Sequence, residues 1–202
     1  METINNTDLK TIITDSLQNA ISYQEYRQLV AKLVEEGGTT GNEKTEALSN
    51  YTMLNDRRMK RWDKTVKVSE AIQKQVTNLN INQTWLVLTE SWCGDAAHVL
   101  PVMHKMAALN DGIDFKLVMR DENPELMQQF LTNGGQAIPK LILIDNETGT
   151  VKSTFGPRPS EATELVSLYK AKHGSLTPNL KKLYSIGITK TKDKPLLMIC
   201  LE

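Results

Sequence analysis

The stretch Thr89-Glu90-Ser91-Trp92-Cys93-Gly94-Asp95-Ala96 decides the fold. It joins a compact β-favouring run, residues 84–89, to a helical pattern over 95–109. A cysteine at the start of a helix faces unpaired backbone N–H groups and the positive end of the helix dipole, and both favour the thiolate. The stretch also lies at the carboxyl edge of a predicted sheet, where α/β folds place ligands. We therefore interpret Cys93 as a nucleophile rather than as a small core residue.

The pattern around this stretch predicts an α/β domain. From residue 84 the order is strand 84–89, helix 95–109, strand 113–119, helix 124–131, strand 140–145, strand 151–155 and helix 160–172. Helices join the first three strands, which predicts parallel pairing, and a tight turn joins the last two, which predicts antiparallel pairing. The sequence therefore predicts a mixed sheet.

The part of the chain before this domain reads as helical. Ser22 and Glu25 form a capping-box pattern before a helix that stops at Gly37, and helical stripes follow over 48–62 and 68–79. No strand is expected there. The predicted organisation is a helical extension over 1–80 that packs on the core, a domain over 81–174, and a short helix and tail over 175–202.

Several motifs, taken in order, resemble the thioredoxin superfamily. They are Trp92-Cys93-Gly94, Pro101 eight residues after the cysteine, the Asp-x-Asn-Pro turn at 121–124, the Ile-Pro strand at 137–143, and Gly156. The resemblance implies a three-layer α/β/α fold with a mixed sheet, a nucleophilic Cys93 and a cis-proline at Pro139. With its helical extension, the chain looks like a member of a subfamily of extended thioredoxin-like proteins that carry a single-cysteine WCGDA motif.

Three departures from the family pattern bear on the chemistry. Ala96 replaces the family's second, resolving cysteine, and Asp95 replaces its proline. Val87 stands where the family has a buried aspartate that assists the resolving step. We expect the intramolecular resolving step to be absent.

The resemblance also assigns roles to the neighbours of Cys93. Trp92, Gly94 and Asp95 should contribute to substrate binding, and the backbone of Ile138, which the cis-proline exposes, should pair with an extended substrate. The carboxylate of Asp95 should oppose the thiolate, so the pKa of Cys93 is expected to fall less than in the strongest oxidants of the family.

Two charged residues at the same edge have competing interpretations. Arg120 follows a strand that is predicted to run parallel to the first, so it should emerge beside Cys93. There it should stabilise a thiolate, bind the carboxylate of glutathione or of a peptide substrate, or pair instead with Asp121 or Glu122. Glu90 is interpreted as a solvated loop carboxylate.

Other candidates give weaker signals. The charged stretch 55–64 places Asn55, Arg58 and Trp62 on one helix face, which usually indicates a solvated basic face, although contact with a peptide remains open. The three histidines lack metal-ligand spacing with either cysteine, so no metal site is expected. Cys200, in an apolar run, is interpreted as a small buried hydrophobe.

Composition excludes several classes of function. Lys plus Arg (24) balances Asp plus Glu (24), so no overall field favours nucleic acid. No apolar run is long enough to span a membrane, no secretory signal is visible, and two distant cysteines do not make a disulfide scaffold, so we expect a cytoplasmic protein. Its oligomeric state is not predicted.

The functional hypothesis is thiol–disulfide exchange through Cys93 alone, with protein thiols or disulfides as partners and with glutathione or another low-molecular-weight thiol, rather than a bound cofactor, completing the cycle. A redox-silent module that binds peptides or proteins is the alternative. An iron–sulfur carrier is a more distant one.

Overall fold

A computed structural model describes residues 6–158, which form an α/β structure around one sheet. The elements are α1 (Asn6–Gln18), β1 (Ile21–Ser22), α2 (Tyr23–Glu35), α3 (Glu46–Thr65), α4 (Glu70–Thr77), β2 (Gln83–Thr89), α5 (Ala96–Ala107), β3 (Ile113–Met119), α6 (Pro124–Gln129), β4 (Lys140–Asp145) and β5 (Val151–Phe155). The helix expected over 160–172 and the tail, with Cys200, lie outside the described residues.

The sheet is mixed, as expected, but one pairing prediction was wrong. Its strand order is β1-β3-β2-β4-β5, with β2 parallel to β3 and β4 antiparallel to both β2 and β5. Helix α6 spans only about 9 Å along its axis, whereas a seven-residue strand spans about 23 Å. The chain therefore does not cross back over the sheet after β3, and β4 starts from the edge at which β3 ends.

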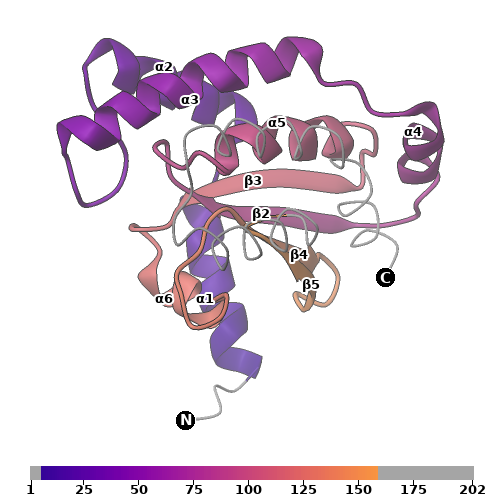
Figure 1. Cartoon of the computed structure of the whole chain (residues 1–202). Coiled ribbons are helices and arrows are strands. Elements are labelled where there is room, and N and C mark those ends of the chain that lie inside the picture. The colour runs from indigo at the N-terminus through magenta and orange to yellow at the C-terminus, as the bar shows by residue number, and fades with distance from the viewer. Residues whose placement is uncertain (1–5, 159–202) are drawn as a thin grey trace, which may run out of the picture.

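Helices cover both faces of the sheet. Helices α2, α3 and α5 lie on one side, and α1 and α6 lie on the other, which gives the three expected layers (Figure 1). Strand β2 runs through the centre and is buried on both faces, which suits its continuous apolar sequence.

The N-terminal part contains a strand that the sequence did not predict. Ile21 and Ser22 pair antiparallel with Leu117 and Lys116 of β3. Two residues are too few for an alternating pattern, and Ser22 also caps α2 in the predicted capping box with Glu25.

The charged helix α3 is not a solvated face, which corrects the prediction for residues 55–64. Asn55 and Trp62 are buried, and the Trp62 indole N–H donates to Nδ1 of His98 on α5 at 3.0 Å. The face that carries Asn55 and Trp62 therefore packs on the helix that follows Cys93, and Arg58, at the edge of this face, is half-buried. The basic side chains elsewhere on α3 remain exposed.

No helix among residues 6–158 combines the length and the apolar character needed to cross a membrane.

Candidate functional site

Cys93 lies in the turn between β2 and α5, where two backbone groups contact its sulfur. The Ala96 N–H donates to Sγ at 3.4 Å, and the thiol donates to the Ile138 carbonyl at 3.3 Å. The side chain is only 7% exposed. It is an unpaired thiol held between a helix N-terminus and the strand that follows Ile138.

The Ile138–Pro139 peptide bond is cis, as predicted. The Ile138 carbonyl, which contacts Cys93, places this turn beside the thiol. Gly156 packs against the same turn with φ +127°, and a Cβ there would overlap the Pro139 carbonyl oxygen. A glycine is therefore required at the position where the family motif has one.

A pocket of about 590 Å³ opens over the thiol. Its lining residues are Leu48, Tyr51, Trp92, Cys93, Gly94, Asp95, Arg120, Gln136, Ala137, Ile138, Pro157 and Arg158. Six of the predicted site residues thus share one pocket, and Pro139 follows directly after its Ile138 edge. Leu48 and Tyr51 come from α3, in the N-terminal part that the motifs did not mark.

The pKa of Cys93 is raised, whereas the sequence predicted that it would be lowered. Burial raises its pKa to about 12, and the Asp95 carboxylate adds to this rise. The backbone N–H groups of Ala96 and Asp95 and the guanidinium of Arg158 act in the opposite direction. The helix N-terminus does favour the thiolate, but the loss of water around a buried sulfur outweighs it.

Asp95 forms an ion pair with Arg158. Its side chain makes no capping hydrogen bond to α5, and its Oδ2 instead accepts from Arg158 Nε at 2.7 Å. Because Arg158 neutralises part of the charge beside the sulfur, it reduces the opposition that Asp95 exerts on the thiolate.

Glu90 is not a solvated loop residue, which corrects the prediction for it. Its side chain is fully buried, and Oε1 accepts the backbone N–H of Asp121 at 2.9 Å. Oε2 has no hydrogen-bond partner, and burial raises the pKa of this carboxyl. Glu90 thereby links the turn of Cys93 to the end of β3.

Arg120 pairs with Asp121, one of the alternatives that the sequence left open. Its Nε and Nη2 atoms both lie 2.7 Å from Asp121 Oδ1. Its guanidinium also lies 5.0 Å from the centre of the Trp92 ring, so it forms one wall of the pocket.

A cluster of buried polar groups, which no motif in the sequence predicted, anchors the turn. The Ser91 hydroxyl accepts the N–H of Thr40 at 3.0 Å and lies 2.8 Å from the Thr52 hydroxyl. The Ser91 N–H donates to Thr40 Oγ1 at 2.7 Å, and Asn55 donates to the Ser91 carbonyl at 3.0 Å. Thr39 and Thr40 lie between two predicted helices, and the only sequence signal for their burial is a pair of threonines next to Gly41.

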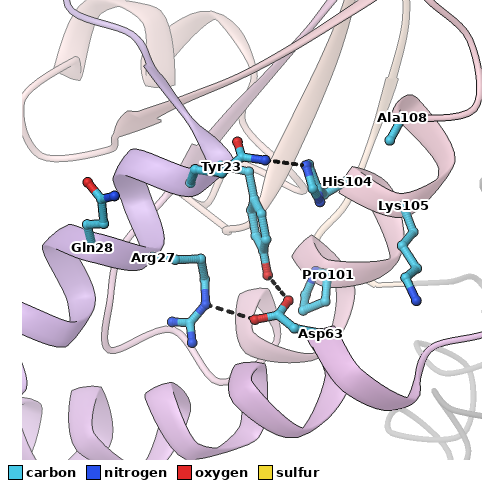
Figure 2. A pocket seen from close by; sticks show the side chains of 9 residues that line it. Tyr23, Arg27, Gln28, Asp63, Pro101, His104, Lys105 and Ala108 are labelled. Carbon is cyan, nitrogen blue, oxygen red and sulfur yellow. Dashed lines mark hydrogen bonds and ion pairs between the residues drawn. The ribbon is translucent and has the colours of Figure 1, made fainter.

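A second cavity, of about 570 Å³, lies between α2, α3 and α5. Figure 2 shows Tyr23 at its centre, between Asp63 and His104. The Tyr23 hydroxyl donates to Asp63 at 2.6 Å, Arg27 holds the other oxygen of Asp63, and the Tyr23 ring stacks on His104. Within the described part of the chain, no group of acidic, histidine and cysteine side chains is arranged to hold a metal ion.

A family model described as thioredoxin matches residues 41–172, about two thirds of the chain. The chain belongs to this thioredoxin family. The match starts inside the N-terminal part, at the glycine that packs beside Trp92, and so includes helix α3.

Solved structures share this thioredoxin fold at low sequence identity. A protein of unknown function from Pseudomonas aeruginosa superposes with a TM-score of 0.57 at 16% identity, over 84% of this chain and 95% of that one. An HIV epitope scaffold superposes with a TM-score of 0.56 at 15% identity, over 84% and 96% of the two chains. No curated protein matches the sequence significantly.

Proposed function

We propose that this thioredoxin-family protein exchanges thiols and disulfides through Cys93 alone. One observation carries the proposal: the Cys93 thiol lies at the N-terminus of α5, against the carbonyl that precedes Pro139, in a pocket open to a partner. Cys93 is the sole cysteine among residues 6–158, and Ala96 occupies the position of a resolving cysteine.

The first step joins Cys93 to its partner. Cys93 gives up its proton to solvent, and the thiolate attacks one sulfur of a partner disulfide. A new bond forms between Sγ and that sulfur, the partner's S–S bond breaks, and the second partner sulfur leaves as a thiolate that takes up a proton. The Ala96 N–H, which already contacts Sγ, stabilises the anion during this step.

The second step needs a thiol from outside. A low-molecular-weight thiol such as glutathione loses its proton and attacks the partner's sulfur in the mixed disulfide. Cys93 leaves as the thiolate, and the partner is released as a mixed disulfide with the small thiol. A second small thiol then releases the reduced partner and forms the small-molecule disulfide, so the electrons come from the small thiol.

A second candidate function is a redox-silent binding module. The specific observation in its favour is the state of the thiol, which is nearly buried and has a pKa raised to about 12. In this case the pocket binds a partner segment, and Cys93 is a packing residue at its base.

Disulfide exchange with an added thiol separates the two candidates. Reduction of a peptide disulfide should be negligible for the protein alone, should rise with glutathione concentration, and should vanish in Cys93→Ser. Cys200→Ser is the matched control and should retain the activity. Equal rates for wild type and Cys93→Ser would leave the binding module as the function.

A further inference from the structure

One flank of α3 continues the Cys93 pocket along the surface. Tyr51 and Leu54 are 49% and 39% exposed, and with Arg58 and Arg61 they recur at spacings of three and four residues, which places them on the same side of the helix. We call these four residues the α3 stripe. Tyr51, together with Leu48, also lines the pocket, so the stripe begins at the wall of the pocket that contains Cys93.

Of the two cations of the stripe, Arg58 interacts electrostatically with the Asp95 carboxylate, whereas Arg61 forms no salt bridge with a carboxylate among the described residues. Arg58 donates to the Asn55 side chain, and the Arg61 guanidinium lies over the Trp62 ring. A Cβ placed on Gly94 would lie 3.5 Å from Arg58 Nη1, so this cation lies directly beside the turn of Cys93.

The opposite flank of α3 differs, because its carboxylates are paired. Asp56 pairs with both Arg27 and Lys60, and Asp63 pairs with Arg27 and accepts from Tyr23, as Figure 2 shows for Asp63. In a chain whose formal charges cancel, the stripe is thus a local patch of positive charge next to exposed apolar side chains.

We propose that the α3 stripe docks an acidic segment of the partner protein whose cysteine reacts with Cys93. The proposal rests on the proposed function and names the chemistry of its partner. Apolar side chains of the segment pack on Tyr51 and Leu54, and its carboxylates lie against Arg58 and Arg61. Two exposed apolar residues and two cations suit a peptide better than nucleic acid, whose binding depends on many phosphate contacts.

Three synthetic peptides test the docking. Each carries one cysteine as a mixed disulfide with thionitrobenzoate, flanked by acidic and apolar residues, by serines, or by lysines and serines. Attack of Cys93 on the peptide sulfur releases coloured thionitrobenzoate, and the second-order rate is measured with the full chain carrying Cys200→Ser, so that Cys93 is its only thiol. The acidic peptide should react on the order of tenfold faster than the lysine peptide at low salt, and the ratio should shrink at high salt because screening weakens the attraction.

Matched variants locate the effect on the stripe. Leu54→Ser and Arg61→Glu should each remove most of the preference for the acidic peptide. Met53→Ser and Lys64→Glu change an exposed apolar residue and an exposed cation of α3 outside the stripe, and both should keep the preference. Loss of the preference in the controls as well would contradict the assignment to the stripe.

Binding to Cys93→Ser separates this proposal from the proposed function. Fluorescence anisotropy with the reduced, labelled peptides reports docking without exchange. If Cys93→Ser binds the acidic peptide and the Cys200→Ser protein releases no thionitrobenzoate, the docking stands and the exchange function fails. If the Cys200→Ser protein reacts equally with all three peptides, the docking is overturned and the exchange function stands. Tighter binding to polyuridylate or to phosphatidylserine vesicles than to the acidic peptide overturns the assignment of a protein partner.

Discussion

The hydroxyl of Thr52 lies 2.8 Å from the hydroxyl of Ser91, and 39 residues separate the two in sequence. Both side chains are buried, and Ser91 is two residues before Cys93. The position of the turn that carries Cys93 therefore depends on hydrogen bonds from helix α3, outside the segment that carries the thioredoxin motifs.

Thr52→Val should lower the free energy of unfolding by about 1–3 kcal/mol, because it removes a buried hydroxyl and leaves its partners with fewer hydrogen bonds. Urea unfolding measures this. Thr65→Val, which removes an exposed hydroxyl bonded within the same helix, is the control and should change stability little. Equal effects of the two substitutions would mean that the buried cluster does not stabilise the turn.

Glu90→Gln should stabilise the protein at neutral pH and have little effect near pH 4. The folded-state pKa of Glu90 is raised by burial, so the stabilising contribution of its protonated form is lost as pH rises through that pKa. Glutamine keeps the oxygen that accepts the Asp121 N–H and carries no charge. Thermal unfolding at a series of pH values checks this, and a gain that is independent of pH would contradict the burial argument.

Gly41→Ala should destabilise the protein more than Gly37→Ala. Both glycines have positive φ, +85° and +67°, and alanine is strained at either position. A Cβ at Gly41 would also lie 2.8 Å from Asp121 Oδ2 and 3.2 Å from Trp92 Nε1, whereas a Cβ at Gly37 would meet nothing within 4 Å. The difference between the unfolding midpoints of the two variants measures the cost of the close approach of the added Cβ at position 41. Tryptophan fluorescence should change only for Gly41→Ala, because only this Cβ approaches Trp92.

Asp95→Asn should lower the pKa of Cys93, and Arg158→Gln should raise it. The first substitution removes a negative charge beside the sulfur, and the second removes the guanidinium that favours the thiolate. Thiolate absorbance against pH, in a Cys200→Ser background, measures both. Asp114→Asn, at the other end of the parallel strand β3, is the control and should not shift the titration.

Alkylation of Cys93 by iodoacetamide should speed up about tenfold per pH unit from pH 7 to pH 10, without a plateau. The thiolate is the reacting species, and with a pKa of about 12 its fraction is still rising across this whole range. Peptide mapping by mass spectrometry follows the modified cysteine. A plateau near neutral pH would contradict the raised pKa, because it would show that Cys93 is already ionised at neutral pH in the protein without a partner.

Local signals predicted most of the fold, whereas the surroundings of the site depended on distant packing. The ranges of β3, β4 and β5 and the capping box at Ser22 were predicted from short patterns, and the cis bond at Pro139 was predicted from the family resemblance. The direction of β4 depended on the length of α6, and Glu90 is buried beside Thr40 and Gly41, which are far away in sequence. In the sequence alone, a buried loop residue cannot be distinguished from a solvated one until the segment that covers it is known.

The two-residue strand β1 has a consequence for association between molecules. A strand at the edge of a sheet offers unpaired N–H and C=O groups to any other extended chain. Ile21 and Ser22 form the edge strand next to β3, where they pair with Leu117 and Lys116. Pairing with this very short edge strand covers only Lys116 and Leu117, so it limits edge-to-edge association at that part of β3, while the opposite side of β3 pairs with β2, which leads to Cys93.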